Sequence, residues 1–143
     1  MGRIIKGQAV IAGEAGGLTL FSREPLSFWG GYNQQTGEII DRRHPLSGQM
    51  AAGCILALPA ARGSSTTTAV LLEAVRAGKA PAAIVTDGPD RFFALASIVA
   101  DEMYQKPIPV IALSSDDFAS LQSGLWIQVS RDGTLMVSDR QGT

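Results

Sequence analysis

The chain has 143 residues and a formal net charge of −1, with 45% hydrophobic and only 17% charged residues. This length suits one domain with a real core, and we take residues 1–143 as that domain. The charge gives no electrostatic footprint for nucleic acid or an anionic membrane surface. One cysteine excludes an internal disulfide framework and cannot by itself build a metal site. Without a signal-peptide pattern or an apolar run of ~20 residues, we expect a cytoplasmic protein.

The first 41 residues are rich in glycine and extended in pattern. Apolar residues at 5–11 and 18–21 predict two short strands, separated by the glycine-rich residues 12–17. The next segment, from Leu26 to Tyr32, has three aromatic residues among small ones. We expect this irregular segment to form an apolar docking surface for a partner, with core packing for at least one of Phe28 and Trp29.

The middle of the chain alternates between short apolar runs and helical patterns, which predicts a βαβαβ unit with a parallel sheet. The predicted strands and helices follow one another as Cys54–Leu58, Thr67–Ala77, Ala83–Thr86, Arg91–Gln105 and Ile108–Ala112. Gly78 suits the end of the first helix, and Asp87 to Asp90 suit a turn that caps the second. At the start of its strand, Cys54 suits a small buried hydrophobic residue better than a cluster ligand.

The last thirty residues predict a capped short helix from Ser114 to about Gly124, then a hairpin. Its strands are expected at 125–129 and 134–137, around an Asp-Gly turn at Asp132. The predicted fold is therefore α/β, with a small parallel βαβαβ core flanked by β elements from both termini.

The segment between the first buried strand and the first helix carries the strongest functional signal. Arg62 and Gly63 precede five consecutive hydroxyl residues, Ser64 to Thr68. Free backbone N–H groups and the helix dipole favour negative charge at such a helix start. The run is compatible with a purely structural N-cap, and also with a hydroxyl that accepts a proton or a loop that binds a carboxylate or phosphate.

Six segments form an ordered set over nearly the full length. They are Gly7-Gln8-Ala9, Glu24-Pro25-Leu26-Ser27-Phe28-Trp29-Gly30-Gly31, Gly37-Glu38-Ile39-Ile40-Asp41, His44-Pro45-Leu46-Ser47-Gly48, Arg62-Gly63-Ser64-Ser65 and Ala80-Pro81-Ala82-Ala83-Ile84. In this set the chain resembles the small subunit, or swivelling domain, of the aconitase X group of dehydratases. The resemblance implies a swivelling β/β/α domain, analogous to the mobile fourth domain of aconitase.

The resemblance also implies a partner and a substrate class. In the family this domain closes over a larger domain or subunit that holds an iron–sulfur cluster, so we expect a heterodimer whose cofactor lies on the large subunit. Bacterial members are associated with dehydration of cis-3-hydroxy-L-proline and archaeal ones with mevalonate 5-phosphate. The doubled serine, Ser64-Ser65, looks more like the bacterial branch.

Dehydration of a hydroxy acid needs a base at the carbon beside the carboxylate and a Lewis acid on the leaving oxygen. The resemblance assigns the base to the first serine after Arg62-Gly63, which is Ser64, with Ser65 as the second candidate. Arg62 is expected to stabilise a serine alkoxide or to grip the substrate carboxylate.

Three further residues, Arg43, His44 and Gly63, are the expected substrate contacts. His44 is equally compatible with a loop hydrogen bond. Two other functions compete with catalysis: a module that binds an anion without chemistry, and a phosphohistidine-type swivelling domain that carries a group on His44. The second is disfavoured because His44 lies in an irregular arginine-rich stretch and not at a helix start.

Overall fold

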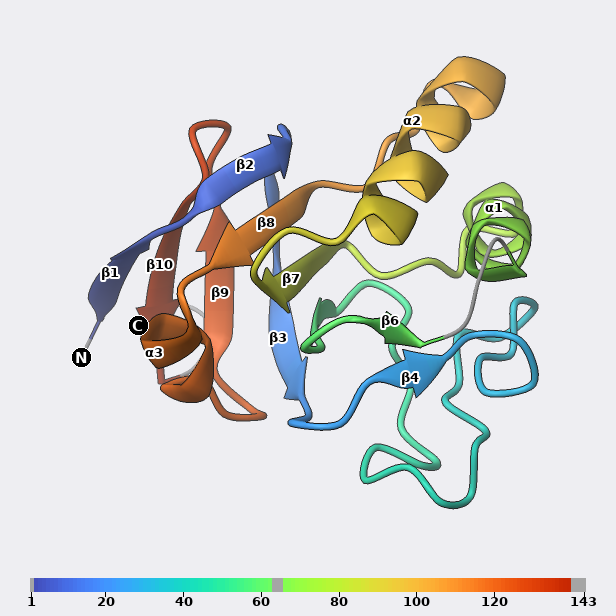
Figure 1. Cartoon of the computed structure of the whole chain (residues 1–143), viewed down its shortest axis with the longest axis horizontal. Coiled ribbons are helices and arrows are strands. Elements are labelled where there is room, and N and C mark those ends of the chain that lie inside the picture. Colours follow the sequence, from blue (N-terminus) through green and yellow to red (C-terminus); the bar gives the residue numbers. More distant parts are fainter. Residues whose placement is uncertain (1, 63–65, 140–143) are drawn as a thin grey trace.

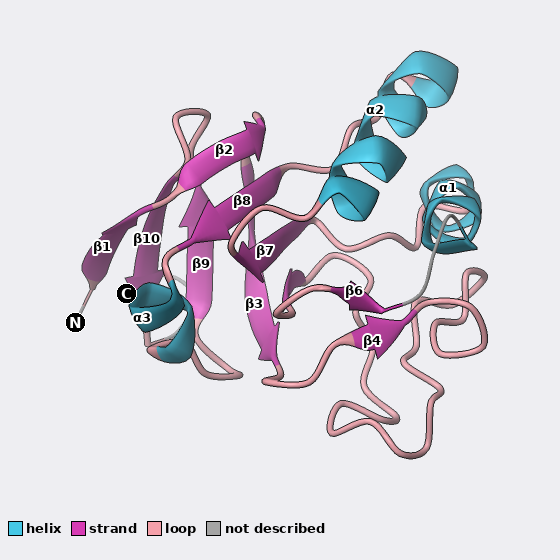
Figure 2. Ribbon diagram, in the orientation of Figure 1, coloured by secondary structure: helices cyan, strands magenta, loops and turns pink. Residues whose placement is uncertain are grey.

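The computed structural model describes residues 2–62 and 66–139, which form a curled mixed sheet with helices packed against it (Figures 1 and 2). The sheet contains eight strands in the order β1-β10-β9-β3-β5-β7-β8-β2. In chain order these strands are β1 (Arg3–Lys6), β2 (Gln8–Ile11), β3 (Ala15–Phe21), β5 (Ile55–Ala57), β7 (Ala83–Asp87), β8 (Val110–Leu113), β9 (Trp126–Val129) and β10 (Thr134–Ser138). The helices are α1 (Thr66–Arg76), α2 (Arg91–Tyr104) and α3 (Ser115–Ala119), and a separate two-stranded sheet pairs β4 (Leu26–Ser27) with β6 (Ala61–Arg62).

The predicted βαβαβ core is confirmed. Strands β3, β5, β7 and β8 pair in parallel, and α1 and α2 connect β5 to β7 and β7 to β8. Antiparallel strands from both termini extend this core on each side, as expected. Helix α3 is shorter than predicted, because it ends at Ala119 and not near Gly124.

The first predicted strand is in fact two strands at opposite edges of the sheet. Strand β1 pairs with β10 and β2 pairs with β8, although only Gly7 separates β1 from β2 in the sequence. The sheet must therefore curl until its two edges are joined by the chain itself. Gly7 permits this junction, because a Cβ atom there would lie 2.6 Å from the Ile111 side chain and 3.0 Å from the Gly133 carbonyl oxygen.

Apolar side chains fill the inside of the curl. This cluster takes residues from β1, β5, β7, β8, β9, β10 and α3, and it consists of Ile5, Ile55, Ala57, Ala83, Val85, Ile111, Leu113, Phe118, Leu121, Ile127, Val129, Leu135 and Val137. Because strands alternate their side chains, the opposite face of the parallel strands is free to bury a second cluster under α1 and α2.

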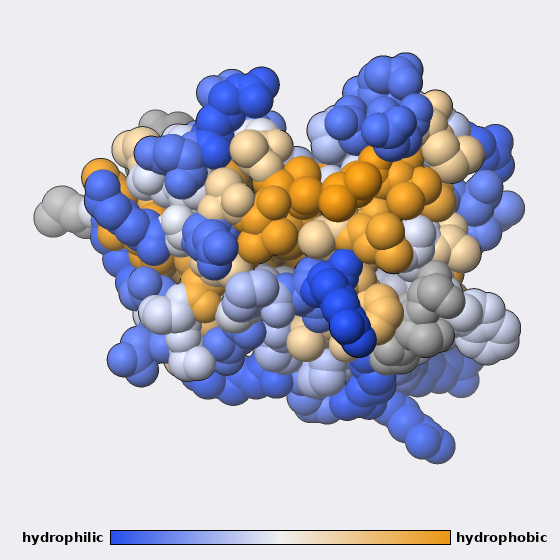
Figure 3. Space-filling model, turned by 45° about the horizontal axis from the view of Figure 1, so that its top comes forward, coloured by the Kyte–Doolittle hydropathy of each residue, from blue (hydrophilic) through white to orange (hydrophobic). Residues whose placement is uncertain are grey.

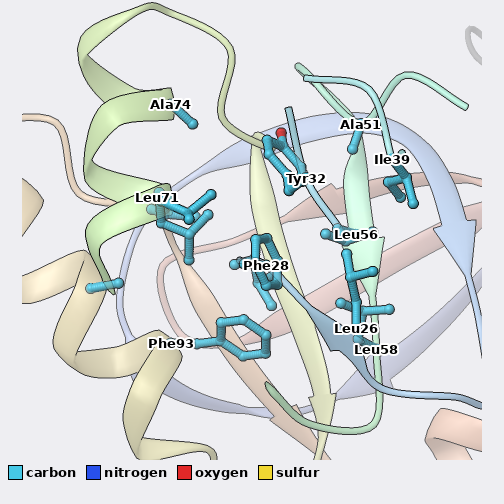
Figure 4. Packing of buried hydrophobic residues seen from close by; sticks show 14 of the residues in the cluster. Leu26, Phe28, Tyr32, Ile39, Ala51, Leu56, Leu58, Leu71, Ala74 and Phe93 are labelled. Atoms are coloured by element: carbon cyan, nitrogen blue, oxygen red, sulfur yellow. The ribbon is translucent and has the colours of Figure 1, made fainter. Parts of the chain in front are cut away.

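The second cluster corrects one expectation about the segment from Leu26 to Tyr32. Leu26, Phe28 and Tyr32 are core residues and not a docking surface, and Figure 4 shows them beside Leu71 of α1 and Phe93 of α2. The Phe28 and Tyr32 rings lie together, with their centroids 5.2 Å apart. They are brought together by a turn in which the Gly31 and Tyr32 N–H groups donate to the Phe28 carbonyl oxygen. The buried Tyr32 hydroxyl donates to the Lys79 carbonyl oxygen at 2.7 Å. Trp29 alone of these aromatics is exposed, at 70%.

The helix ends follow local sequence signals. Helix α1 is terminated by Gly78, which lies two residues after the last residue of the helix and has φ +73°. There the Lys79 N–H donates to the Ala74 carbonyl oxygen, and the Gly78 N–H donates to the Val75 carbonyl oxygen. Asp90 caps the start of α2, as the sequence predicted. Within residues 2–62 and 66–139, no helix combines the length and apolar character that a membrane crossing requires.

Candidate functional site

The candidate site lies where the parallel strands end. The chain leaves β5 and enters the serine loop, which we define as residues 59–65 and which contains the short strand β6. Strand β6 is anchored through its parallel pairing with β4, in which Leu26 faces Ala61 and Ser27 faces Arg62. Since Leu26 is fully buried, this pairing ties Arg62 to the core.

A pocket of about 440 Å³ opens beside Arg62, and we call it the arginine pocket. Its lining residues come from three separate parts of the chain and are Glu24, Pro25, Asp41, Arg42, Arg43, His44 and Arg62. Three predicted site residues, Arg43, His44 and Arg62, thus meet at one pocket. The other three, Gly63, Ser64 and Ser65, lie outside the described residues.

The arginine pocket carries three guanidinium groups against two carboxylates. On the exposed surface of α1, Arg76 forms an ion pair with Glu73 at 2.7 Å, whereas Arg42, Arg43 and Arg62 form no ion pair with another described residue. Asp41 instead accepts a hydrogen bond from the Arg43 backbone N–H at 3.0 Å. The three guanidinium groups are exposed and available for a ligand carboxylate or phosphate.

His44 is 7% exposed, and backbone groups occupy both nitrogens of its ring. Nδ1 accepts from the Leu46 N–H at 3.1 Å, so Nε2 carries the proton and donates to the Glu24 carbonyl oxygen at 3.1 Å. The loop role considered for His44 is therefore present in the structure, and a substrate contact stays a prediction. Neither nitrogen is free to accept a transferred group, which disfavours the phosphohistidine alternative.

The threonines after the serine loop lie in the first turn of α1, which begins at Thr66, one residue before the predicted start at Thr67. Thr67 and Thr68 have buried hydroxyl oxygens with no hydrogen-bond partner among the described residues. Ser64 and Ser65, the first two residues of the run for which an N-cap was considered, lie outside the described part of the chain.

Two contributions to the site escaped the sequence reasoning. Glu24 lines the arginine pocket, although it lies 20 residues from His44, and only the folded chain brings them together. Asp90 was expected to cap α2, yet it also binds the base of the serine loop, as described below. No local sequence pattern signals either contact.

The chain's single cysteine is half-buried at the start of β5. Its thiol donates to the Met50 carbonyl oxygen at 3.3 Å, and burial raises the pKa of Cys54 above its ordinary value of 9.0. Within residues 2–62 and 66–139, no three His, Cys, Asp or Glu side chains come together as metal ligands.

The fold and the site together define a swivelling α/β domain with an arginine-bearing serine loop at one edge of its sheet. The aconitase X swivel domain model matches residues 4–137, and the chain belongs to this family. It is similar to the crystal structure of Thermococcus kodakaraensis aconitase X in its holo-form, with a TM-score of 0.83 and 30% identity over 94% of this chain and 98% of that one.

Curated relatives carry two different names. The chain is 42% identical, over 92% of its length, to cis-3-hydroxy-L-proline dehydratase of Pseudomonas aeruginosa, and 39% identical, over 87%, to that of Hypocrea jecorina. It spans only about a fifth of these two proteins, 22% and 21%. It is 32% identical to the phosphomevalonate dehydratase small subunit of Thermococcus kodakarensis, over 90% of both chains.

Proposed function

We propose that this chain is the small subunit of an aconitase X-type hydro-lyase that dehydrates a hydroxy acid in a site shared with a larger subunit. The observation that carries the proposal is the convergence of Arg43, His44 and Arg62 on one pocket at the base of the serine loop. The exposed guanidinium groups match an anionic substrate, and the loop that follows Arg62 brings hydroxyl groups to the start of α1.

Ser64 is the proposed base, and it removes the proton beside the substrate carboxylate. A serine hydroxyl is a weak acid, so its alkoxide needs a positive potential from its surroundings. The start of α1 and the Arg62 guanidinium supply that sign of potential, and exclusion of water on closure strengthens both. Arg43, which lines the same pocket, holds the substrate carboxylate, while Gly63 lets the loop backbone approach the ligand.

The donor set of this chain does not fit an iron–sulfur cluster. A cluster normally takes three or four cysteine thiolates, and the sequence has one cysteine. We therefore place the family's cluster on the larger subunit, where it supplies the Lewis acid for the leaving hydroxyl. Relatives in which this domain is about a fifth of a longer chain support such a partner.

The proposed substrate is cis-3-hydroxy-L-proline. The higher identity to the dehydratases of that name, 42% and 39% against 32% for the phosphomevalonate protein, favours it. Mevalonate 5-phosphate is the second candidate, because three exposed guanidinium groups suit a phosphate as well as a carboxylate.

An apolar surface supports the proposed partner. Figure 3 shows it across the face that carries α2 and β2, where Leu95 and Ile98 are exposed and Val10 and Phe92 line adjoining hollows. Trp29 adds an exposed aromatic, two residues after Ser27, which pairs with Arg62 in the β4–β6 sheet. Large exposed apolar surface of this kind commonly marks an interface.

Reconstitution tests the proposal. The chain is purified anaerobically, assayed for iron, sulfide and dehydration of both substrates, and then mixed with the large aconitase X-type subunit from the same genome. We expect turnover of cis-3-hydroxy-L-proline by the mixture alone and no stoichiometric cluster on this chain. A cluster on the isolated chain would refute the assignment of the cofactor to the partner. Full-affinity binding of either substrate by the isolated chain, with no turnover by the mixture, would favour the anion-binding module instead.

A further inference from the structure

Asp90 connects two elements that are far apart in the sequence. Its Oδ1 accepts hydrogen bonds from the N–H groups of Phe92 at 2.9 Å and Phe93 at 3.1 Å, which caps α2. Its Oδ2 accepts from the Ala61 N–H at 2.8 Å. Ala61 immediately precedes Arg62, so one carboxylate spans the start of α2 and the base of the serine loop.

A helix cap alone does not require this arrangement. Ser, Thr or Asn satisfies the first N–H groups of a helix about as well as Asp, and each uses one oxygen to do so. Only a carboxylate offers two acceptor oxygens with no donor, which the two separate sets of N–H groups demand. The residue type at position 90 therefore matches the additional bond to Ala61 more closely than it matches the cap.

The hydrogen bond between Asp90 and Ala61, which we call the bridge, anchors β6 to an element other than β4. Strand β6 has two residues and a single neighbouring strand, β4, in its sheet. The Ala61 N–H bond to Asp90 adds a second anchor, on the segment that leads from β7 into α2. A hydrogen bond to a charged group is among the stronger contacts available to a backbone N–H.

We propose that Asp90 is a positioning residue for strand β6, and that it acts on the reaction through the placement of Arg62. This inference rests on the proposed function, in which Arg62 and Ser64 carry the chemistry. Catalytic groups lose much of their effect when they shift by about 1 Å, so a loosened loop base lowers turnover without removing any reacting group.

Asp90→Ser separates the bridge from the cap. The serine hydroxyl still accepts from the first N–H groups of α2, but it has no second oxygen for Ala61. The matched control is Ser114→Ala, which removes the cap of α3, where the Ser114 hydroxyl accepts from the Asp117 N–H at 3.2 Å. Asp90→Asn is the near-isosteric second variant, whose amide places an N–H₂ group against one of the two sets of donors.

The first measurement is amide hydrogen exchange of the isolated chain by NMR, which is independent of any activity. We expect the Ala61 amide of Asp90→Ser to exchange at least ~10-fold faster than in the wild type, with the amides inside α2 unchanged and no such change in Ser114→Ala. Unaltered Ala61 exchange would show that the bridge does not hold the loop, and would overturn the inference whatever the enzyme does.

The second measurement is turnover by the assembled enzyme. We expect kcat to fall about 10- to 100-fold in Asp90→Ser and to stay within ~2-fold of wild type in Ser114→Ala. In an Arg62→Ala background, Asp90→Ser should cause little further loss, because a residue that acts through the placement of Arg62 has nothing left to position. A full additional loss in that background would mean a merely structural role. Normal turnover by Ser64→Ala alone would refute the proposed base, while the exchange result would still decide whether Asp90 holds Ala61.

Discussion

Two different parts of the chain line the arginine pocket: strand β6 with Arg62, which we call the first wall, and residues 41–44 with Arg43, which we call the second wall. The two walls are held by different kinds of contact. The Arg62 wall is a strand with a backbone partner in β4 and a carboxylate anchor at Asp90. The Arg43 wall is irregular, and one buried imidazole joins it to Glu24. The first wall is tied to two other elements, whereas the second is held by local turn hydrogen bonds around Asp41 and by the two side-chain bonds of His44. Mutations should therefore affect chemistry on the first wall and local stability on the second.

The largest expected effect is on the first wall, at Ser64. In the assembled enzyme, Ser64→Ala should lower kcat by several orders of magnitude, about 10²- to 10⁴-fold for loss of a positioned base, with little change in KM. Ser65→Ala should be much milder. Steady-state kinetics with cis-3-hydroxy-L-proline, after a check of assembly, makes the comparison. Near-normal turnover by Ser64→Ala would place the base on the other subunit and leave the serine run as a helix cap.

Lysine substitutions of Arg62 and Arg43, which line the same pocket, form a matched pair of variants. Arg62→Lys should lower kcat/KM about 10- to 100-fold, since an ammonium cannot reproduce the bidentate fork of a guanidinium. The loss appears in kcat if Arg62 stabilises the alkoxide and in KM if it grips the carboxylate. Arg43→Lys should act mainly on KM. Equal losses in kcat for both variants would contradict the division of roles between the walls.

His44 tests how far the second wall depends on a single side chain. His44→Ala removes two backbone hydrogen bonds and leaves the buried Leu46 N–H without a partner, which should lower the free energy of unfolding by about 2–3 kcal/mol. Urea unfolding of the isolated chain measures this change. Pro45→Ala, one residue away and exposed, is the control that should stay near wild type. If His44→Ala instead keeps full stability and loses only substrate affinity, His44 is a ligand contact.

The parallel core was predictable because its elements carry local signals. Apolar runs such as 83–86 end at turn residues, and Asp90 and Gly78 stand where a cap and a helix end require them. For the segment from Leu26 to Tyr32, the expected core packing of at least one of Phe28 and Trp29 is confirmed at Phe28, but the expected docking surface was wrong for Leu26, Phe28 and Tyr32. An aromatic in an irregular segment gives no period that separates core from surface. The arginine pocket could not be foreseen as a whole, since Glu24, Asp41 and Arg62 meet only through the tertiary fold.

Phe28 and Trp29 are neighbours in the sequence, and together they test which residues of the segment from Leu26 to Tyr32 contact the partner and which belong to the core. Trp29→Ala should change the unfolding free energy of the isolated chain by no more than ~0.5 kcal/mol, because Trp29 is 70% exposed, yet weaken assembly with the large subunit about 10-fold. Phe28→Ala should do the opposite and cost about 3–5 kcal/mol of stability, because Phe28 is 0% exposed. Titration of each variant against the large subunit, beside urea unfolding, decides the matter. Unfolding of Trp29→Ala would make Trp29 a core residue.

The smallest expected effect is the pH dependence of the unfolding free energy that comes from the buried Tyr32. Tyr32 belongs to the apolar cluster under α1 and α2, and its burial raises the pKa of its hydroxyl above the ordinary value of 10.0. This hydroxyl donates to the Lys79 carbonyl oxygen. Above pH 10 the unfolded chain releases the Tyr32 proton while the folded chain keeps it, so stability falls as pH rises and is unaffected well below pH 10. At pH 10.5 this linkage amounts to about 0.8 kcal/mol for one such group.

Tyr32→Phe should be about 1 kcal/mol less stable than wild type at pH 8, from loss of the bond to Lys79, and should lose less stability than wild type between pH 8 and 10.5. Urea unfolding at the two pH values gives the difference, in which the titrations shared by both proteins cancel. An identical loss in both proteins would show that the Tyr32 hydroxyl ionises as readily in the folded chain as in the unfolded one, and that the core around Tyr32 is more open than its packing indicates.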